Sequence, residues 1–240
     1  MRKWDTLPDS MKNDKVKEYY DLLCKKKLSL LLKRMFDILV SGILLVMLCP
    51  VFLLIAVAIK LDSPGTVFYR QTRITRYGEK FRIYKFRTMV SDADKGSKLT
   101  VANDSRITRV GAFLRKYKLD ELGQLIDVFR GKMSFVGTRP EVEKYVSVYS
   151  DEMLATLLLP AGITSEASVC YKDENSLLDN AENPEDVYIN RILPDKMNYN
   201  LKAIKEFSFI GEIGIMIKTV LAVFMDDDKI ARQAEKSEKL

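Results

Sequence analysis

Uncharged apolar residues run without interruption through residues 38–59, and this segment dominates the hydropathy pattern of the chain. As one helix it would reach about 33 Å, enough to cross a hydrocarbon core of about 30 Å. Pro50 lies past its middle, where it removes a backbone hydrogen bond and biases Cys49 away from helical geometry. A break there leaves halves of about 18 and 14 Å, neither of which would span alone. The pattern therefore fits either a kinked spanning helix or two short helices joined at Cys49-Pro50.

The charges beside this segment favour the second arrangement. Basic residues flank both of its ends: Lys25, Lys26, Lys27, Lys33 and Arg34 before it, and Lys60, Arg70, Arg73 and Arg76 after it. Because positive charge is retained on the cytoplasmic side, both ends are expected there. We therefore predict a re-entrant helix–break–helix segment over residues 25–60, with a single transmembrane anchor as the alternative.

The remaining pattern alternates short β segments with helical stretches. Two β segments are predicted at residues 66–74 and 80–89, on either side of a turn at Tyr77-Gly78. Helical spacing begins at Arg109 and continues through Phe129. Further predictions are a loop at 130–140, a helix at 141–159, a short strand and turn at 161–174, a helix–Pro–helix at 181–207 and a helix at 212–224.

These elements predict a mostly helical α/β fold with four regions. They are a polar extension at residues 1–24, partly helical, the membrane segment at 25–60, a compact cytosolic catalytic domain at 61–225 and a mobile tail at 226–240. The first residues have no apolar core and no cleavage site, so they do not resemble a signal peptide.

Composition narrows the chemistry. The formal net charge is +6, from 39 basic and 33 acidic residues, which suits an anionic partner. Histidine is absent, so mechanisms that use a Ser-His or Cys-His pair and His-ligated metal sites are excluded. The three cysteines are scattered and form no CxxC motif, which fits a reducing compartment.

Asp120 and Glu121 stand out because they follow a basic run that contains Arg115, Lys116 and Lys118. One interpretation is ordinary helix capping, since an acid at a helix start is common. The other is catalysis, because a carboxylate among cations is held ionised and serves as a nucleophile or metal ligand.

Three further segments are candidates for binding. Lys85 and Arg87 would lie on one face of a strand, as phosphate ligands or as a solvated strand face. Arg139, in the segment FVGTRP, could grip phosphate oxygens, or the segment could be a turn before a helix. The acids of Asp92-Ala93-Asp94 match a glycosyltransferase pattern but read as an exposed loop.

The order and spacing of these segments resemble those of the bacterial sugar transferases, the membrane-monotopic polyprenyl-phosphate phosphoglycosyl transferases. The matching pieces are KRMFD before the broken apolar run, SPGTVFYRQTRITRYGEKFRIYKFRTM, ITRVGAFLRKYKLDELGQLIDVFRGKMSFVGTRP and, more weakly, GITSEASVCYKDE. The similarity covers roughly residues 30–200.

The resemblance implies transfer of a phosphosugar from a UDP-sugar to polyprenyl phosphate, usually undecaprenyl phosphate, with release of UMP. Asp120 matches the family nucleophile, and Glu121 matches its neighbour, which is associated with Mg²⁺. Lys85, Arg115 and Arg139 match basic positions near the diphosphate, and Lys172 lies near a common arginine. The resemblance also implies interfacial amphipathic helices and a re-entrant segment in the bacterial inner membrane, with the catalytic domain on the cytoplasmic face and surface glycan synthesis as the outcome.

The sequence departs from the family pattern at several positions. Gly123 stands where proline is usual, Cys49 precedes Pro50 where serine is common, and Thr138 replaces a proline. An acid in the region of Asp186 and Asp195 should matter, and the sequence does not choose between them. The sugar, the glycan and the oligomeric state are also left open, including a homo-oligomer. The alternative function is a non-catalytic, membrane-tethered basic protein that binds anionic lipid or nucleic acid. As an enzyme, the protein is expected to have no nucleic-acid partner.

Overall fold

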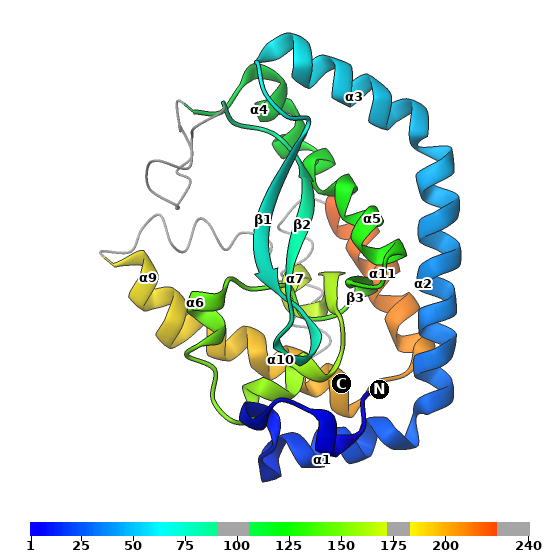
Figure 1. Cartoon of the computed structure of the whole chain (residues 1–240), viewed down its shortest axis with the longest axis vertical. Coiled ribbons are helices and arrows are strands. Elements are labelled where there is room, and N and C mark those ends of the chain that lie inside the picture. Colours follow the sequence, from blue (N-terminus) through cyan, green and yellow to red (C-terminus); the bar gives the residue numbers. More distant parts are fainter. Residues whose placement is uncertain (91–105, 172–182, 225–240) are drawn as a thin grey trace. The chain divides into compact units, whose positions relative to one another are not determined.

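The computed structural model describes residues 1–90, 106–171 and 183–224, and these residues form two compact units (Figure 1). The first unit comprises Met1–Met35, Ile74–Glu79 and the chain from Ser134 onward. The second comprises Phe36–Arg73 and Lys80–Met133. Helices predominate in both, and the described strands form two sheets of two strands each, which confirms a mostly helical α/β fold.

The second unit is built on one hairpin and the helices around it. Its elements are most of α2 (Lys27–Met47), α3 (Cys49–Asp62), β1 (Phe68–Ile74), β2 (Lys80–Phe86), α4 (Arg109–Lys116), η5 (Leu119–Gly123) and α5 (Gln124–Phe129). Its buried core joins Ile55 and Ile59 of α3 to Phe86 of β2 and Leu114 of α4. The predicted hairpin is confirmed; its turn, η3 (Arg76–Gly78), belongs to the first unit.

The first unit contains the other elements. They are η1 (Trp4–Thr6), η2 (Asp9–Met11), α1 (Asp14–Lys25), β3 (Met133–Val136), α6 (Glu143–Val146), η6 (Met153–Leu158), β4 (Ala161–Thr164), α7 (Glu166–Cys170), α9 (Pro184–Val187), the π-helical turn η7 (Tyr188–Ile192), α10 (Leu193–Lys205) and α11 (Phe209–Phe224). The N-terminal residues belong to its core, since Val16, Tyr19 and Leu23 are fully buried against η6 and α10 residues such as Leu158 and Ile204.

Three predicted elements of this unit were wrong. Residues 133–136, predicted as loop, form β3, because all four are buried and the strand pairs with β4. The single helix predicted at 141–159 is divided into α6 and η6. There the Ser147 hydroxyl donates to the Lys144 carbonyl, and the Ser150 hydroxyl accepts the N–H of Met153, so side chains replace helical backbone bonds.

The expected break at Pro194 is also absent. Pro194 lies in the first turn of α10, directly after the five-residue π-helical turn η7. The wider turn accommodates the proline, so residues 184–205 continue without a non-helical interruption.

The apolar segment folds as two helices, α2 and α3. Among the residues that the structure describes, no single helix is long and apolar enough to cross a membrane, whereas α2 and α3 pass that test as a pair bent by 60°. The break is confirmed, but it falls at Leu48, and Pro50 lies in the first turn of α3, where a missing N–H costs little. The predicted lengths of the two halves, about 18 and 14 Å, were too short, since α2 has 21 residues and α3 has 14.

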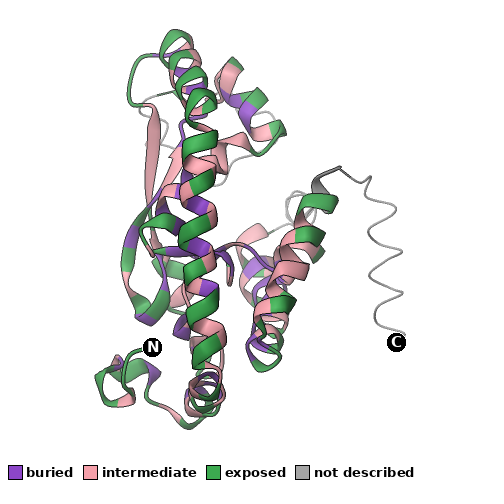
Figure 2. Cartoon of the chain, turned by 90° about the vertical axis from the view of Figure 1, so that its right-hand side faces the viewer, coloured by how far each residue is buried: buried purple, intermediate pink, exposed green. Residues whose placement is uncertain are grey.

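Helix α2 has one buried polar face and a broad exposed apolar surface. Lys33, Asp37 and Ser41, spaced four residues apart, are only 5 %, 3 % and 0 % exposed. The Lys33 ammonium donates to the Val136 carbonyl at 2.9 Å and pairs with Glu212 of α11. In Figure 2, α2 faces the viewer with much of its surface exposed. Its exposed apolar residues are Leu28, Leu31, Leu32, Met35, Ile38, Leu39, Ile43, Val46 and Met47.

Candidate active site

Asp120 and Glu121 lie in the short 3-10 turn η5, between α4 and α5. Lys118, with a φ of 56°, reverses the chain before this turn, and no side chain caps it. Asp120 is its second residue, and across the described part of the chain its carboxylate makes no hydrogen bond or ion pair. Both acids thus lie in the first turn of η5, as the capping interpretation expects, but no side-chain capping bond forms there, and Asp120 is left with an unshared carboxylate.

Lys85 of β2 contacts this acid pair. Its ammonium lies 2.8 Å from Glu121 Oε1, and both side chains are about one-fifth exposed. The sequence separation is 36 residues, so the contact depends on η5 packing against β2. The fold therefore brings together Lys85, Asp120 and Glu121, three of the predicted site residues.

Burial, rather than the neighbouring cations, dominates the ionisation of Asp120. Desolvation raises the pKa of Asp120 above its ordinary value, whereas the positive charges of Lys85, Lys118 and Arg115 oppose the rise. The expectation that the cations would hold this acid ionised was therefore wrong in its sign. A carboxylate with a raised pKa is a stronger base, and in its ionised form a stronger nucleophile.

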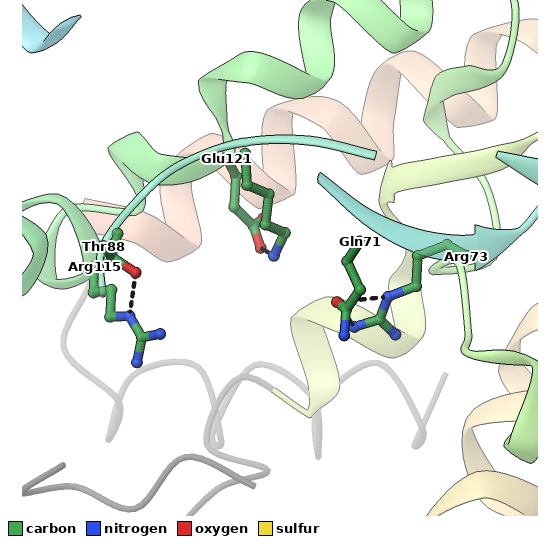
Figure 3. A network of polar contacts seen from close by, with 6 residues as sticks. Gln71, Arg73, Thr88, Arg115 and Glu121 are labelled. Atoms are coloured by element: carbon green, nitrogen blue, oxygen red, sulfur yellow. Dashed lines mark hydrogen bonds and ion pairs between the residues drawn. The ribbon is translucent and has the colours of Figure 1, made fainter. Parts of the chain in front are cut away.

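Arg115 is positioned by a contact from α4 to the end of the hairpin. Its Nε donates to Thr88 Oγ1 at 2.9 Å, which leaves the terminal nitrogens of the guanidinium directed away from that bond (Figure 3). The basic run before Asp120 thus supplies one cation with a fixed orientation.

Gln71 and Arg73 were not predicted as site residues. Arg73 donates from Nε and from one terminal nitrogen to Gln71 Oε1, at 3.1 and 2.8 Å. Because Arg87 N bonds Val67 O, antiparallel pairing places Tyr69 opposite Lys85, so Gln71 and Arg73 share the face of Lys85. Figure 3 shows them projecting to the same side as Glu121 and Arg115. The alternation in FYRQTRI contained this signal.

Arg87 is occupied by the protein itself. It is 6 % exposed, and its terminal nitrogens donate to the carbonyls of Ser63 and Pro64 at 2.7 and 2.6 Å. These carbonyls follow the end of α3, so Arg87 joins the hairpin to the membrane segment. Its predicted phosphate-binding role stays a prediction.

Arg139 belongs to the first unit, where it is exposed in the segment after β3. Gly137 and Gly162 hold that segment against β4, because a Cβ added to Gly162 would lie 2.2 Å from Gly137 N. Only glycine permits such an approach of two backbones. The phosphate role of Arg139 stays a prediction of the family resemblance.

The remaining predicted residues are placed as follows. Lys172, Asp92 and Asp94 lie outside the described residues. Asp186 accepts a hydrogen bond from the Asn190 amide at 2.8 Å on an exposed face, whereas Asp195 accepts one from the Tyr171 hydroxyl.

The acid pair is also the place to test the predicted magnesium. Residues 1–90, 106–171 and 183–224 contain no cluster of three or more His, Cys, Asp or Glu side chains that could hold a metal ion. Mg²⁺ commonly binds proteins through one or two carboxylates and completes its shell with water and phosphate oxygens. The adjacent carboxylates of Asp120 and Glu121 fit that sparse mode and do not fit an all-protein cage.

Comparison with known proteins defines the family. The model of the bacterial sugar transferase family matches residues 28–226, so the chain belongs to this family. The UDP-glucose:undecaprenyl-phosphate glucose-1-phosphate transferase of Escherichia coli K12 is 37% identical over 202 residues, which cover 82% of this chain and 41% of that protein. The UDP-N-acetylgalactosamine-undecaprenyl-phosphate N-acetylgalactosaminephosphotransferase of Aeromonas hydrophila is 33% identical over 196 residues, 80% of this chain and 43% of that protein.

A shorter relative matches over most of its length. The exopolysaccharide production protein ExoY of Rhizobium meliloti is 31% identical over 207 residues, which cover 80% of this chain and 84% of that protein. The chain thus spans about two-fifths of the two longer relatives and most of ExoY. Membership in a transferase family supports the enzyme prediction over the non-catalytic alternative.

Proposed function

We propose that the chain transfers a sugar phosphate from a UDP-sugar to undecaprenyl phosphate, the first step in building a bacterial surface glycan. The names of the two longer relatives support the donor and acceptor classes, and ExoY supports a role in exopolysaccharide production. The observation that carries the proposal is the unshared Asp120 carboxylate beside the Lys85–Glu121 pair. The relatives act on different sugars, so the sugar is not part of the proposal.

The reaction would proceed in two steps through Asp120. A carboxylate oxygen attacks the phosphorus next to the sugar, the bond from that phosphorus to the bridging oxygen breaks, and UMP leaves with the electron pair. An oxygen of undecaprenyl phosphate then attacks the same phosphorus and releases Asp120. The product is the polyprenyl diphosphate sugar, and no water is consumed. One carboxylate can thus serve a soluble donor and then a lipid acceptor.

Cations of the site would offset the charge of the diphosphate. Lys85 is paired with Glu121, and Arg115, held by Thr88, adds positive charge that acts on Asp120; phosphoryl transfer depends on such preorganised positive charge. Asp120 and Glu121 would hold Mg²⁺, which when bound neutralises phosphate charge. Lys85 would also keep the Glu121 carboxylate oriented.

The membrane segment would bring this site to the lipid acceptor. The 60° bend at Leu48 and the basic residues on both flanks support a re-entrant hairpin in the inner membrane, entered and left on the cytoplasmic face. The exposed apolar residues of α2 and α3 would contact lipid, and nearby Lys and Arg would each contribute about 1 kcal/mol toward anionic headgroups.

The test is detection of the covalent intermediate. The intact chain is incubated with Mg²⁺ and a panel of UDP-sugars without acceptor, and mass spectrometry should find one phosphosugar on Asp120, with UMP released. Asp120→Asn should give no adduct. Adduct formation at wild-type level in that variant, or release of UDP instead of UMP, would contradict the proposal.

Glu121→Gln gives a second variant for the same assay. It keeps the size of the side chain but removes the charge that pairs with Lys85. We expect a folded protein with turnover reduced at least about 100-fold. Asp151→Asn, an exposed acid of the first unit, is the matched control and should leave turnover unchanged.

A further inference from the structure

Asp127 is a buried acid that the proposed chemistry leaves without a role. It lies on α5 and is 2 % exposed, and its Oδ2 accepts the backbone N–H of Tyr84 at 2.8 Å. Because Arg87 N bonds to the carbonyl of Val67, the residue before β1, alternation along β2 points the N–H and C=O of Tyr84 away from β1. Asp127 therefore occupies the outer edge of β2, where none of the described strands pairs.

Gly123, four residues before Asp127, packs against the carbonyl group of Tyr84. A Cβ added to Gly123 would lie 2.9 Å from the Tyr84 carbonyl oxygen, so η5 rests directly on the strand. Gly123 follows the acid pair by two residues, and Lys85 follows Tyr84 directly. Tyr84 is thus held by Asp127 and by Gly123, and it directly precedes Lys85. These contacts connect the strand that carries Lys85 to the turn η5, which carries the two acids.

The surroundings of Asp127 show that this contact is costly. Burial raises the pKa of Asp127 to about 6, and the hydrogen bond from Tyr84 and the positive charges of Arg70 and Arg130 only partly oppose this rise. Both arginines reach the side chain of Tyr84: the Arg70 guanidinium lies 3.3 Å from the ring centroid, and Arg130 donates to the hydroxyl at 3.3 Å. A buried carboxylate is thus maintained for one backbone hydrogen bond at the strand edge.

We propose that Asp127 is a positioning residue: it fixes the β2 backbone at Tyr84 and thereby sets Lys85 against Asp120 and Glu121. The inference rests on the proposed function. Asp127 itself would touch neither the donor nor the acceptor. Loss of its acceptor would free the Tyr84 N–H, let β2 move relative to η5 and misplace the Lys85 ammonium during phosphorus attack.

Two substitutions separate this role from simple burial. Asp127→Asn keeps an oxygen that can accept the Tyr84 N–H, whereas Asp127→Leu keeps the volume and removes the acceptor. The readouts are the rate of adduct formation at saturating UDP-sugar, the donor KM, and amide exchange of the peptide that contains Tyr84 and Lys85. Asp151→Leu is the control, since Asp151 is exposed and lies in the other unit.

For Asp127→Leu we expect adduct formation at least about 10-fold slower, a donor KM within about 3-fold, and exchange at Tyr84 at least about 10-fold faster. Asp127→Asn should restore both the rate and the protection to within about 3-fold. If the leucine variant does not fold, Asp127→Ser, whose hydroxyl is too short to reach the strand, replaces it.

Wild-type rate and protection in the acceptor-free variant would overturn the inference, as would an asparagine variant as slow as leucine. So would rapid exchange of the Tyr84 amide in the wild-type chain. An active parent is required for these comparisons. A parent that forms no adduct with any UDP-sugar would instead contradict the proposed function, and the positioning role would fall with it.

Discussion

At the scale of single residues, the candidate site in the second unit departs from the family pattern at Gly123. Gly123 stands where proline is usual, and that departure by itself predicts a less rigid start for the turn that carries Asp120. The structure gives the opposite result, because Gly123 is buried and packs on the Tyr84 carbonyl. Its φ of −56° is also one that proline could adopt, so the close approach, rather than backbone freedom, explains the glycine here.

Gly123→Ala should therefore damage the site. The added methyl would meet a backbone oxygen at 2.9 Å, which must shift, and overpacking of this kind costs about 1–3 kcal/mol. We expect a lower midpoint of thermal unfolding and slower adduct formation on Asp120. Gly214→Ala is the matched control, because a Cβ there meets nothing within 4 Å. Equal activity and stability of the two variants would contradict the packing argument.

Asp127 makes a prediction about pH and stability. Its pKa is about 6 in the folded chain and ordinarily 3.8, so the folded state keeps a proton that the unfolded state has released. This contribution is fully present below about pH 4 and is lost as the pH rises through 6. Asp127→Asn does not titrate, so its Tm relative to wild type should rise by at least about 3 °C between pH 4.5 and 7.5. Calorimetry of both proteins tests this; a difference that is independent of pH would contradict it.

At the scale of elements, the break in the membrane segment was predictable and its form was not. Cys49-Pro50 indicated the interruption. Proline is compatible with the first turn of a helix, so the chain bends at Leu48, and α3 begins at Cys49 with Pro50 in its first turn. The start of α2 at Lys27 could not be predicted from hydropathy. It depends on tertiary partners for polar residues, such as the contact of Lys33 with Val136 and Glu212.

Pro50→Ala tests the bend. The substitution restores a backbone N–H and should favour a continuous helix through Leu48, which would be long enough to cross the bilayer. Accessibility labelling of single cysteines near residues 27 and 62, in a variant without Cys24, Cys49 and Cys170, should place both ends on the cytoplasmic side in the parent. In Pro50→Ala a fraction should become labelled on opposite sides. Opposite sides in the parent would exclude the re-entrant arrangement.

Within the site, sequence reasoning found the residues better than it found their roles. Asp120, Glu121 and Lys85 were identified, because charge stands out in a sequence. The relative size of the effects on the pKa of Asp120 was not predictable. Burial outweighs the neighbouring cations there, and burial depends on how η5 packs on β2. For the same reason the sequence did not show that Arg87 bonds carbonyls of the chain, and it gave no sign of the contact that Asp127 makes with β2.

At the scale of the whole molecule, strands and helices with strong periodicity were predicted correctly, including β1, β2, α4 and α11. The errors fall where side chains or packing decide the backbone. Four buried residues became β3 because β4 lies beside them, and serine hydroxyls divided the helix expected at 141–159. Such long-range or local polar contacts leave no periodic signal in a sequence.

The packing of the N-terminal residues has a consequence for how the protein is handled. The family match begins at residue 28, yet Val16, Tyr19 and Leu23 contribute to the core of the first unit. A clone trimmed to the shared region would expose the apolar surfaces that these side chains cover. We expect such a clone to express as aggregates, and a chain that starts at residue 28 but remains monodisperse would contradict this. What its relatives have in common is therefore smaller than what this chain needs to fold.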